Sequence, residues 1–187
     1  MSLRLFVAVL PPPPVVAAWD TLLEPRRDAD PSLRWTLPES WHVTCAFMPA
    51  VPETRLDALA EALDAVAERT PPFEVVVAGA GAFPDPDHAK ALWLGVREGS
   101  DPLARLAGRC RTAVAGCGVE VDGGRFRPHL TLARTRPASA TRWLRVLDAL
   151  PPQAWTVDGF SLVHSRSLPG GAGYRTLREN RLAGPLG

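Results

Sequence analysis

Two short segments of this chain share one pattern, a His followed two residues later by a Thr, each inside an apolar run. They are Trp41-His42-Val43-Thr44-Cys45 and Pro128-His129-Leu130-Thr131-Leu132. Side chains alternate between the two faces of a β-strand, so each His and its Thr are expected on one face, with their apolar neighbours on the other. Each segment therefore predicts a strand with one polar and one buried face.

The surroundings of the two segments are alike as well. Each segment is followed by a stretch with apolar residues at helical spacing and then by a pair of strand-like segments. The first copy has these at 52–68, 73–77 and 91–96, and the second at 138–150, 155–164 and 174–182. Such a repeat predicts two lobes related by a pseudo-twofold axis, with a cleft between them to which each lobe donates one His and one Thr.

The remaining segments favour an α+β class. An apolar run at residues 3–10 predicts a strand buried on both faces, and Pro14 begins a helix that stops at Pro25. Another helix is predicted from Ser100 to Gly116. Strands and helices do not alternate regularly, which argues against a doubly wound parallel sheet.

Composition places the chain among globular proteins. It has 187 residues, 46% of them hydrophobic, and six Trp, enough for one domain over residues 1–187 made of two lobes. Its apolar runs are too short to cross a bilayer and its first residues lack the pattern of a cleavable signal, so a cytoplasmic protein without membrane contact is expected. Three cysteines are interpreted as buried thiols rather than as disulfides or a zinc site.

A second candidate cluster is Asp85, Asp87 and His88, in a loop rich in Pro and Asp. Without a further His or carboxylate at ligand spacing, we interpret this loop as a solvated turn and predict no metal and no cofactor.

Positively charged residues cluster in another part of the chain. The net charge is only +1, yet Arg125, Arg127, Arg134 and Arg136 surround the second His-Thr segment. Two imidazoles, two hydroxyls and a local arginine cluster are suited to acid-base chemistry on a phosphate without a metal.

These motifs resemble those of a known family. The two His-x-Thr-x motifs, together with residues 4–8, 81–84, 92–95 and 126–134, are similar to those of the RNA 2′,3′-cyclic phosphodiesterases, also called 2′-5′ RNA ligases, of the 2H phosphoesterase superfamily. The resemblance spans nearly the whole chain. It implies a bilobal α+β fold with duplicated antiparallel sheets, flanking helices and a central cleft. It also implies hydrolysis of 2′,3′-cyclic phosphate ends of RNA to 2′-phosphomonoesters.

The same resemblance implies roles for individual residues. His42 would be the proton donor and His129 the proton acceptor, although the symmetry of the motifs leaves their order open. Thr44 and Thr131 would donate hydrogen bonds to the non-bridging phosphate oxygens. Arg134, and less directly Arg127, would bind substrate. Strict alternation turns Arg134 away from His129, so Arg134 must lie beyond the strand end or past a bulge.

The chain departs from the family pattern after the first motif. Cys45 stands where an aliphatic residue is usual and should affect only packing, because it points away from the cleft. The next residues, Ala46-Phe47-Met48-Pro49, lack the expected basic residue and glycine, and Pro49 predicts a turn. Stacking of a base on Phe47, Trp35 or Tyr174 is an open option, whereas His88 and His164 are interpreted as structural or surface residues.

Three functions stay open at this point. The first is the cyclic phosphodiesterase, acting as a monomer on RNA ends or on small cyclic nucleotides. The second is ATP-independent joining of tRNA halves through a 2′-5′ bond, which is the same chemistry in reverse. The third is a nucleotide- or RNA-binding module without turnover, against which the two intact His-Thr pairs argue.

Overall fold

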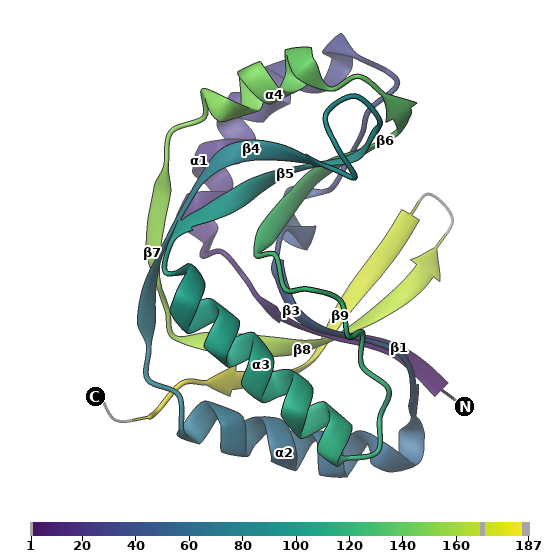
Figure 1. The fold of residues 1–187 in the computed structure, drawn as a ribbon, viewed down its shortest axis with the longest axis vertical. Helices are drawn as coiled ribbons and strands as arrows, with labels where there is room; N and C mark the ends of the chain where they lie inside the picture. The colour runs from purple at the N-terminus through teal and green to yellow at the C-terminus, as the bar shows by residue number, and fades with distance from the viewer. Residues whose placement is uncertain (1, 169–170, 185–187) are drawn as a thin grey trace.

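The structure is a computed structural model that describes residues 2–168 and 171–184. Its β-strands form one antiparallel sheet in the order β7-β4-β5-β6-β3-β1-β8-β9, and the short β2 lies beside β6 (Figure 1). The strands are β1 Ser2–Val9, β2 Arg34–Trp35, β3 Val43–Pro52, β4 Phe73–Phe83, β5 Ala89–Glu98, β6 His129–Ala138, β7 Gln153–Val157, β8 Gly159–Leu168 and β9 Gly171–Arg181. The helices are α1 Pro13–Leu23, α2 Leu56–Glu68, α3 Ser100–Gly116 and α4 Thr141–Asp148, with 3₁₀ turns at Glu24–Ala29, Pro38–Ser40 and Glu53–Arg55.

Apart from the two-residue β2, the sheet has two sections of four strands, and the two strands with the His-Thr motifs meet in its middle. The β6 section contains β7, β4, β5 and β6, and the β3 section contains β3, β1, β8 and β9. Helix α4 packs on β4 and β5, whereas α3 packs on β3 and α2 on β9. Figure 1 shows α1 and α4 beside the upper part of the sheet and α2 and α3 beside the lower part. The α+β class with flanking helices is thus confirmed.

The two lobes are interleaved in the chain rather than formed by its successive halves. Strands β4 and β5 follow β3 in the sequence but belong to the β6 section. Strand β8, which follows β6, pairs with β1 in the β3 section. Strands β4 and β5 therefore complete the section of the second segment, and β8 and β9 that of the first, whereas β7 stays in the section of β6.

The alternation of side chains in β1 separates the core from the cleft. Leu5, Val7 and Val9 are buried in the main core beneath the helices. Phe6 and Ala8 point to the opposite face, where they form a small cluster with Val163 and the half-buried Phe47. We call this opposite face the cleft face of the sheet. The expectation that residues 3–10 form a strand buried on both faces is confirmed for most of its length.

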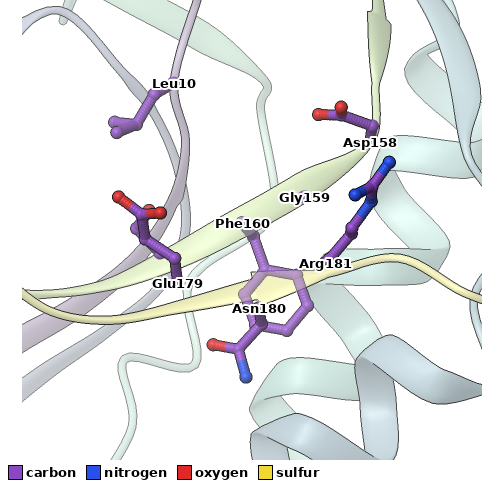
Figure 2. A pocket seen from close by; sticks show the side chains of 8 residues that line it. Leu10, Asp158, Gly159, Phe160, Glu179, Asn180 and Arg181 are labelled. Atoms are coloured by element: carbon purple, nitrogen blue, oxygen red, sulfur yellow. The ribbon is translucent and has the colours of Figure 1, made fainter.

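Residues 155–164 were expected to form one strand, and this prediction is wrong. Asp158 separates β7, which pairs with β4, from β8, which pairs with β1. Figure 2 shows Asp158 and Gly159 beside Asn180 and Arg181 of β9, around a pocket of about 390 Å³. A Cβ on Gly159 would lie 2.9 Å from the carbonyl oxygen of Asn180, so the close approach of β9 needs a glycine there. The break coincides with the Asp158-Gly159 dipeptide, a typical turn signal, so the sequence does mark it.

Other predicted boundaries also change. The helix predicted at 138–150 is shorter, because β6 continues to Ala138 and α4 is Thr141–Asp148. Pro52 ends β3 instead of beginning a helix, and β4 extends to Phe83. Pro49 makes no turn: Leu5 pairs with Met48 and Leu3 with Val51, so Pro49 lies in a bulge of β3. The Pro-Gly-Gly segment at 169–171, whose composition predicts a turn between two strands, falls largely outside the described residues.

The three cysteine thiols are free, with Cys45 and Cys110 buried and Cys117 partly exposed. Burial raises the pKa of the Cys45 thiol to about 12, which makes it inert packing as expected from the sequence. Among the described residues, no helix combines the length and the apolar character needed to cross a membrane.

Candidate active site

The four His and Thr side chains of the two motifs meet where the two sections of the sheet join. Val43 of β3 lies opposite Leu130 of β6, and both are buried in the core. Their neighbours therefore point to the cleft face. Extending the antiparallel pairing by one residue each way places His42 opposite Thr131 and Thr44 opposite His129. These four residues, the His-Thr group, therefore lie at the corners of a square on the cleft face, with the imidazoles on one diagonal.

Both imidazoles are oriented by the same local contact. The Nδ1 atom of His42 lies 2.7 Å from the carbonyl oxygen of Ser40, and that of His129 lies 2.6 Å from the carbonyl oxygen of Arg127. A carbonyl can only accept, so each Nδ1 carries a hydrogen and donates it. The Nε2 atom of each ring is then the one that can accept or donate a proton in the cleft.

Aromatic side chains hold the His42 ring. Phe6 of β1 stacks on His42 with a centroid distance of 4.6 Å, and Tyr174 of β9 meets His42 edge-on at 5.4 Å. Phe6 and Tyr174 also contact each other. Tyr174, an option for stacking a base, is 40% exposed and lies against the imidazole.

Phe83 and Trp93 hold the His129 ring in a similar way. Phe83 of β4 meets His129 edge-on at 4.8 Å, and Trp93 of β5 lies at 6.0 Å. The Trp93 indole occupies the space above Gly81, where a Cβ would lie 2.1 Å from the indole ring. Gly81 is therefore needed for this placement of Trp93. Residues 81–84 and 92–95 carried the family resemblance, and their contact with His129 is a physical reason for that pattern.

The environment lowers the pKa of both imidazoles. For His42 the main cause is burial, to which the positive charges of His129 and Arg134 add. For His129 the main cause is again burial, followed by the charge of Arg134. In both rings the carbonyl bound to Nδ1 opposes the shift. A lowered pKa favours the neutral ring, so an Nε2 lone pair is available as a base near neutral pH.

A bulge in β6 brings Arg134 to the same face as His129. Trp93 of β5 pairs with Thr131, but the next β5 residue, Leu92, pairs with Ala133, so Leu132 is an extra residue. Leu132 and Ala133 are both fully buried, and Arg134 then emerges exposed on the cleft face. The structure therefore contains the bulge that Arg134 needs in order to reach the cleft face.

Thr36 holds this bulge in place. Its hydroxyl lies 2.9 and 2.8 Å from the carbonyl oxygens of Thr131 and Leu132, to which it donates, and its backbone N–H also donates to Leu132. The same hydroxyl accepts a hydrogen bond from the indole of Trp41, the residue before His42. Thr36 thus connects both motifs. A lone Thr outside any motif carries no sequence signal, so Thr36 was not among the residues predicted for the site.

A pocket of about 240 Å³ opens beside Thr44 and His129. Most of its other walls are aromatic or basic, with one acidic residue and one glycine: Phe47, Phe83, Arg111, Asp122, Gly124, Arg125, Phe126 and Arg127. Arg127, predicted as a substrate ligand, contributes an exposed side chain to this pocket and the carbonyl that orients His129. The pocket provides planar and cationic surfaces next to the His-Thr group, as a nucleotide requires.

Several candidates from the sequence lie elsewhere. His88 is exposed, with its Nδ1 3.1 Å from a carboxylate oxygen of Asp85. Trp35 packs edge-on against Trp143 on the helix side of the sheet and is not available for stacking. The described residues contain no group of three or more His, Cys, Asp or Glu side chains arranged to hold a metal ion.

The family model described as the 2′-5′ RNA ligase superfamily matches residues 11–167. The chain belongs to this superfamily. An RNA 2′,3′-cyclic phosphodiesterase of Thermus thermophilus is 33% identical to this chain, over 99% of the chain and 93% of the relative. One from Aeropyrum pernix is 29% identical, over 78% of the chain and 84% of the relative. One from Geobacillus stearothermophilus is 34% identical over 66% of the chain, which spans only 40% of that longer relative.

Solved structures agree with this membership of the superfamily. A crystal structure of a Thermus thermophilus protein superimposes with a TM-score of 0.79 and 27% identity, covering 97% of this chain and 98% of the other. The crystal structure of E. coli LigT complexed with 3′-AMP gives a TM-score of 0.75 and 26% identity, covering 97% and 99% of the two chains. The resemblance inferred from the motifs is thereby confirmed, and so is the fold class.

Proposed function

We propose that this protein hydrolyses 2′,3′-cyclic phosphate ends of RNA to 2′-phosphomonoesters by two-histidine acid-base catalysis that needs no metal. The observation that carries the proposal is the His-Thr group, in which two imidazoles with tethered Nδ1 atoms lie diagonally across one face. The printed names of the relatives, RNA 2′,3′-cyclic phosphodiesterase, support the substrate class.

In the proposed reaction, the Nε2 atom of His129 takes a proton from a water molecule as the water oxygen attacks phosphorus. The bond between phosphorus and O3′ breaks, and the Nε2 atom of His42 gives its proton to O3′. One water is added, and one proton has moved from His42 to His129 through the substrate. The attacking and leaving oxygens lie on opposite sides of phosphorus, which calls for a base and an acid on opposite sides of the phosphate.

The hydroxyls of Thr44 and Thr131 occupy the other diagonal of the square. We assign them hydrogen bonds to the two non-bridging oxygens, where negative charge accumulates in the transition state. Arg134 adds a positive charge on the same face, and Arg127 is a weaker candidate at the pocket beside His129. We also propose that residues 1–187 form one domain and that the enzyme acts as a monomer. Three free thiols fit the reducing cytoplasm in which we place the enzyme.

Product analysis tests the proposed reaction. Nucleoside 2′,3′-cyclic, 3′,5′-cyclic and 2′-5′ linked substrates are incubated with the purified protein, and ³¹P NMR identifies the bond that opens. We expect opening of the 2′,3′-cyclic phosphate to the 2′-monophosphate, with the same rate in EDTA. A second labelled substrate with a 5′-hydroxyl reports ligation. Tight binding without opening of the ring, or formation of the 3′-monophosphate, contradicts the proposal.

Removing the charge of Arg134 should shift the pH profile. Because this cation disfavours the protonated form of both imidazoles, Arg134→Ala should raise the pKa of His42 and His129. Both limbs of the bell-shaped profile of kcat/KM against pH should then move to higher pH, together with a fall in its height. Arg134→Lys keeps the charge and should leave the limbs in place. A profile of Arg134→Ala that is lower but not displaced would refute this coupling.

A further inference from the structure

Two arginines lie directly opposite each other at the far end of the cleft face. Arg34 of β2 pairs with Arg134 of β6, and both are exposed. We propose that Arg34, together with Arg134, binds a second phosphate of the RNA, the one on the 5′ side of the terminal nucleotide. This inference rests on the proposed function and adds a preference for substrates that carry that phosphate.

The side chain of Arg34 points to the cleft face, as the residues beside it show. Trp35, the next residue of β2, lies opposite the buried Ala133 and packs with Trp143 on the helix side. Neighbouring residues of a strand point to opposite faces, so Arg34 points away from the helices. Arg134 reaches the same face because of the bulge at Leu132. The two guanidinium groups thus leave adjacent positions of one surface.

Placing two like charges directly opposite each other in a sheet is unfavourable unless something offsets them. In the part of the chain that the structure describes, the ion pairs within 4.0 Å involve neither Arg34 nor Arg134. A phosphate would offset both charges, and the planar donor groups of two guanidiniums match its oxygens. The pair therefore has the positive charge and the hydrogen-bond donors of an anion site. No carboxylate within 4.0 Å neutralises it in the described part of the chain.

The distance along the sheet separates this pair from the reacting phosphate. Thr131 and Arg134 lie opposite Trp93 and Ala91 of β5, which are two residues apart. At about 3.4 Å per residue, the arginine pair lies about 7 Å beyond Thr131 along the cleft. One nucleotide of an extended strand spans about this length. The charge of Arg134, and not that of Arg34, acts on both imidazoles, so Arg34 is the residue expected to respond to the second phosphate alone.

Substrates that differ only in the 5′ phosphate test this proposal. A nucleoside 2′,3′-cyclic phosphate with a 5′-hydroxyl is compared with the same nucleotide carrying a 5′-phosphate, in wild type, Arg34→Ala and Arg34→Lys. We expect the wild type to favour the 5′-phosphorylated substrate and Arg34→Ala to reduce that ratio of kcat/KM values about tenfold, as loss of a charged hydrogen bond predicts. Arg34→Lys should retain part of the ratio. A ratio that Arg34→Ala leaves unchanged would overturn the proposal.

A control and a binding measurement complete the design. Arg145→Ala removes an equal charge from the exposed side of α4 and should leave the ratio as in wild type. Calorimetry with a nucleoside 2′-monophosphate and the matching 2′,5′-bisphosphate needs no turnover, so it tests Arg34 even if the proposed hydrolysis fails. Tighter binding of the bisphosphate that is lost in Arg34→Ala supports the second site. Equal affinity of the wild type for both ligands refutes it.

Discussion

Replacing His42 or His129 with alanine is expected to lower turnover of a 2′,3′-cyclic phosphate by about 10²–10⁴-fold for each variant. In the proposed mechanism each ring supplies one of the two proton transfers, and a positioned acid or base contributes about this factor. Both rings lie on the cleft face with only Nε2 free, so no neighbouring group of the His-Thr group can replace either one. The initial rate and the identity of the product are measured for each variant.

His88→Ala is the matched control, since that ring is exposed on a loop away from the His-Thr group. Its turnover should equal that of the wild type. Full activity of either His42→Ala or His129→Ala would contradict the proposed mechanism. Calorimetric unfolding of each variant shows whether a loss of activity comes with a lowered Tm, and so results from destabilisation, or without one, and so results from the missing catalytic group.

A substrate with sulfur in place of O3′ decides which histidine is the acid. A thiol has a reference pKa near 8.5, far below that of an alcohol, so the sulfur leaves without being protonated. His42→Ala should recover most of its activity on this substrate if His42 is the proton donor, whereas His129→Ala should not. The opposite pattern would exchange the two roles while leaving the two-histidine mechanism intact.

Thr36→Val is expected to lower both stability and activity, although Thr36 touches none of the reacting groups in the proposed mechanism. The substitution keeps the shape of the side chain and removes a hydroxyl that contacts the carbonyls of Thr131 and Leu132 and the indole of Trp41. The Leu132 carbonyl keeps the backbone N–H of Thr36, but the buried indole N–H of Trp41 loses its partner, which costs about 1–3 kcal/mol. In a protein of this size each kcal/mol corresponds to a fall of roughly 2–4 °C in Tm.

The effect of Thr36 on activity should pass through Arg134. Without the hydroxyl, the bulge that turns Arg134 to the cleft is less well held, so KM should rise more than kcat falls. In an Arg134→Ala background, Thr36→Val should therefore add little to the rise in KM. Thr36→Ser keeps the hydroxyl and should restore most of the activity. Thr21→Val, which removes an exposed hydroxyl bonded within α1, is the control. Additive effects of Thr36→Val and Arg134→Ala on KM would refute the positioning role.

The placement of the site's side chains could be predicted from local patterns in the sequence. A strand fixes which side chains share a face, so the His-x-Thr spacing alone places His42 with Thr44 and His129 with Thr131. The apolar neighbours Val43 and Leu130 follow the same alternation and lie in the core. The bulge before Arg134 could also be inferred, because strict alternation and a role in the cleft are incompatible for that residue.

The pairing partners of the strands depended on contacts that no local pattern contains. The strand predicted at 155–164 breaks at Asp158 because its two parts pair with β4 and β1, which are far apart in sequence. The interleaving of the two lobes also depends on such long-range pairing, which places β4 and β5 beside β6 and β8 beside β1. Periodicity reports whether a residue is buried, but it carries no information on which strand covers it.

The sequence by itself therefore determined the α+β class, the two His-Thr pairs and the family to which they belong, because these depend on spacing within single strands and on local motifs. Only the tertiary structure decided that the two pairs face each other diagonally, that Thr36 holds the bulge beside them and that Arg34 lies opposite Arg134. Each of these arrangements joins segments about 90 to 100 residues apart, and their register is set by packing of the whole sheet rather than by any one segment.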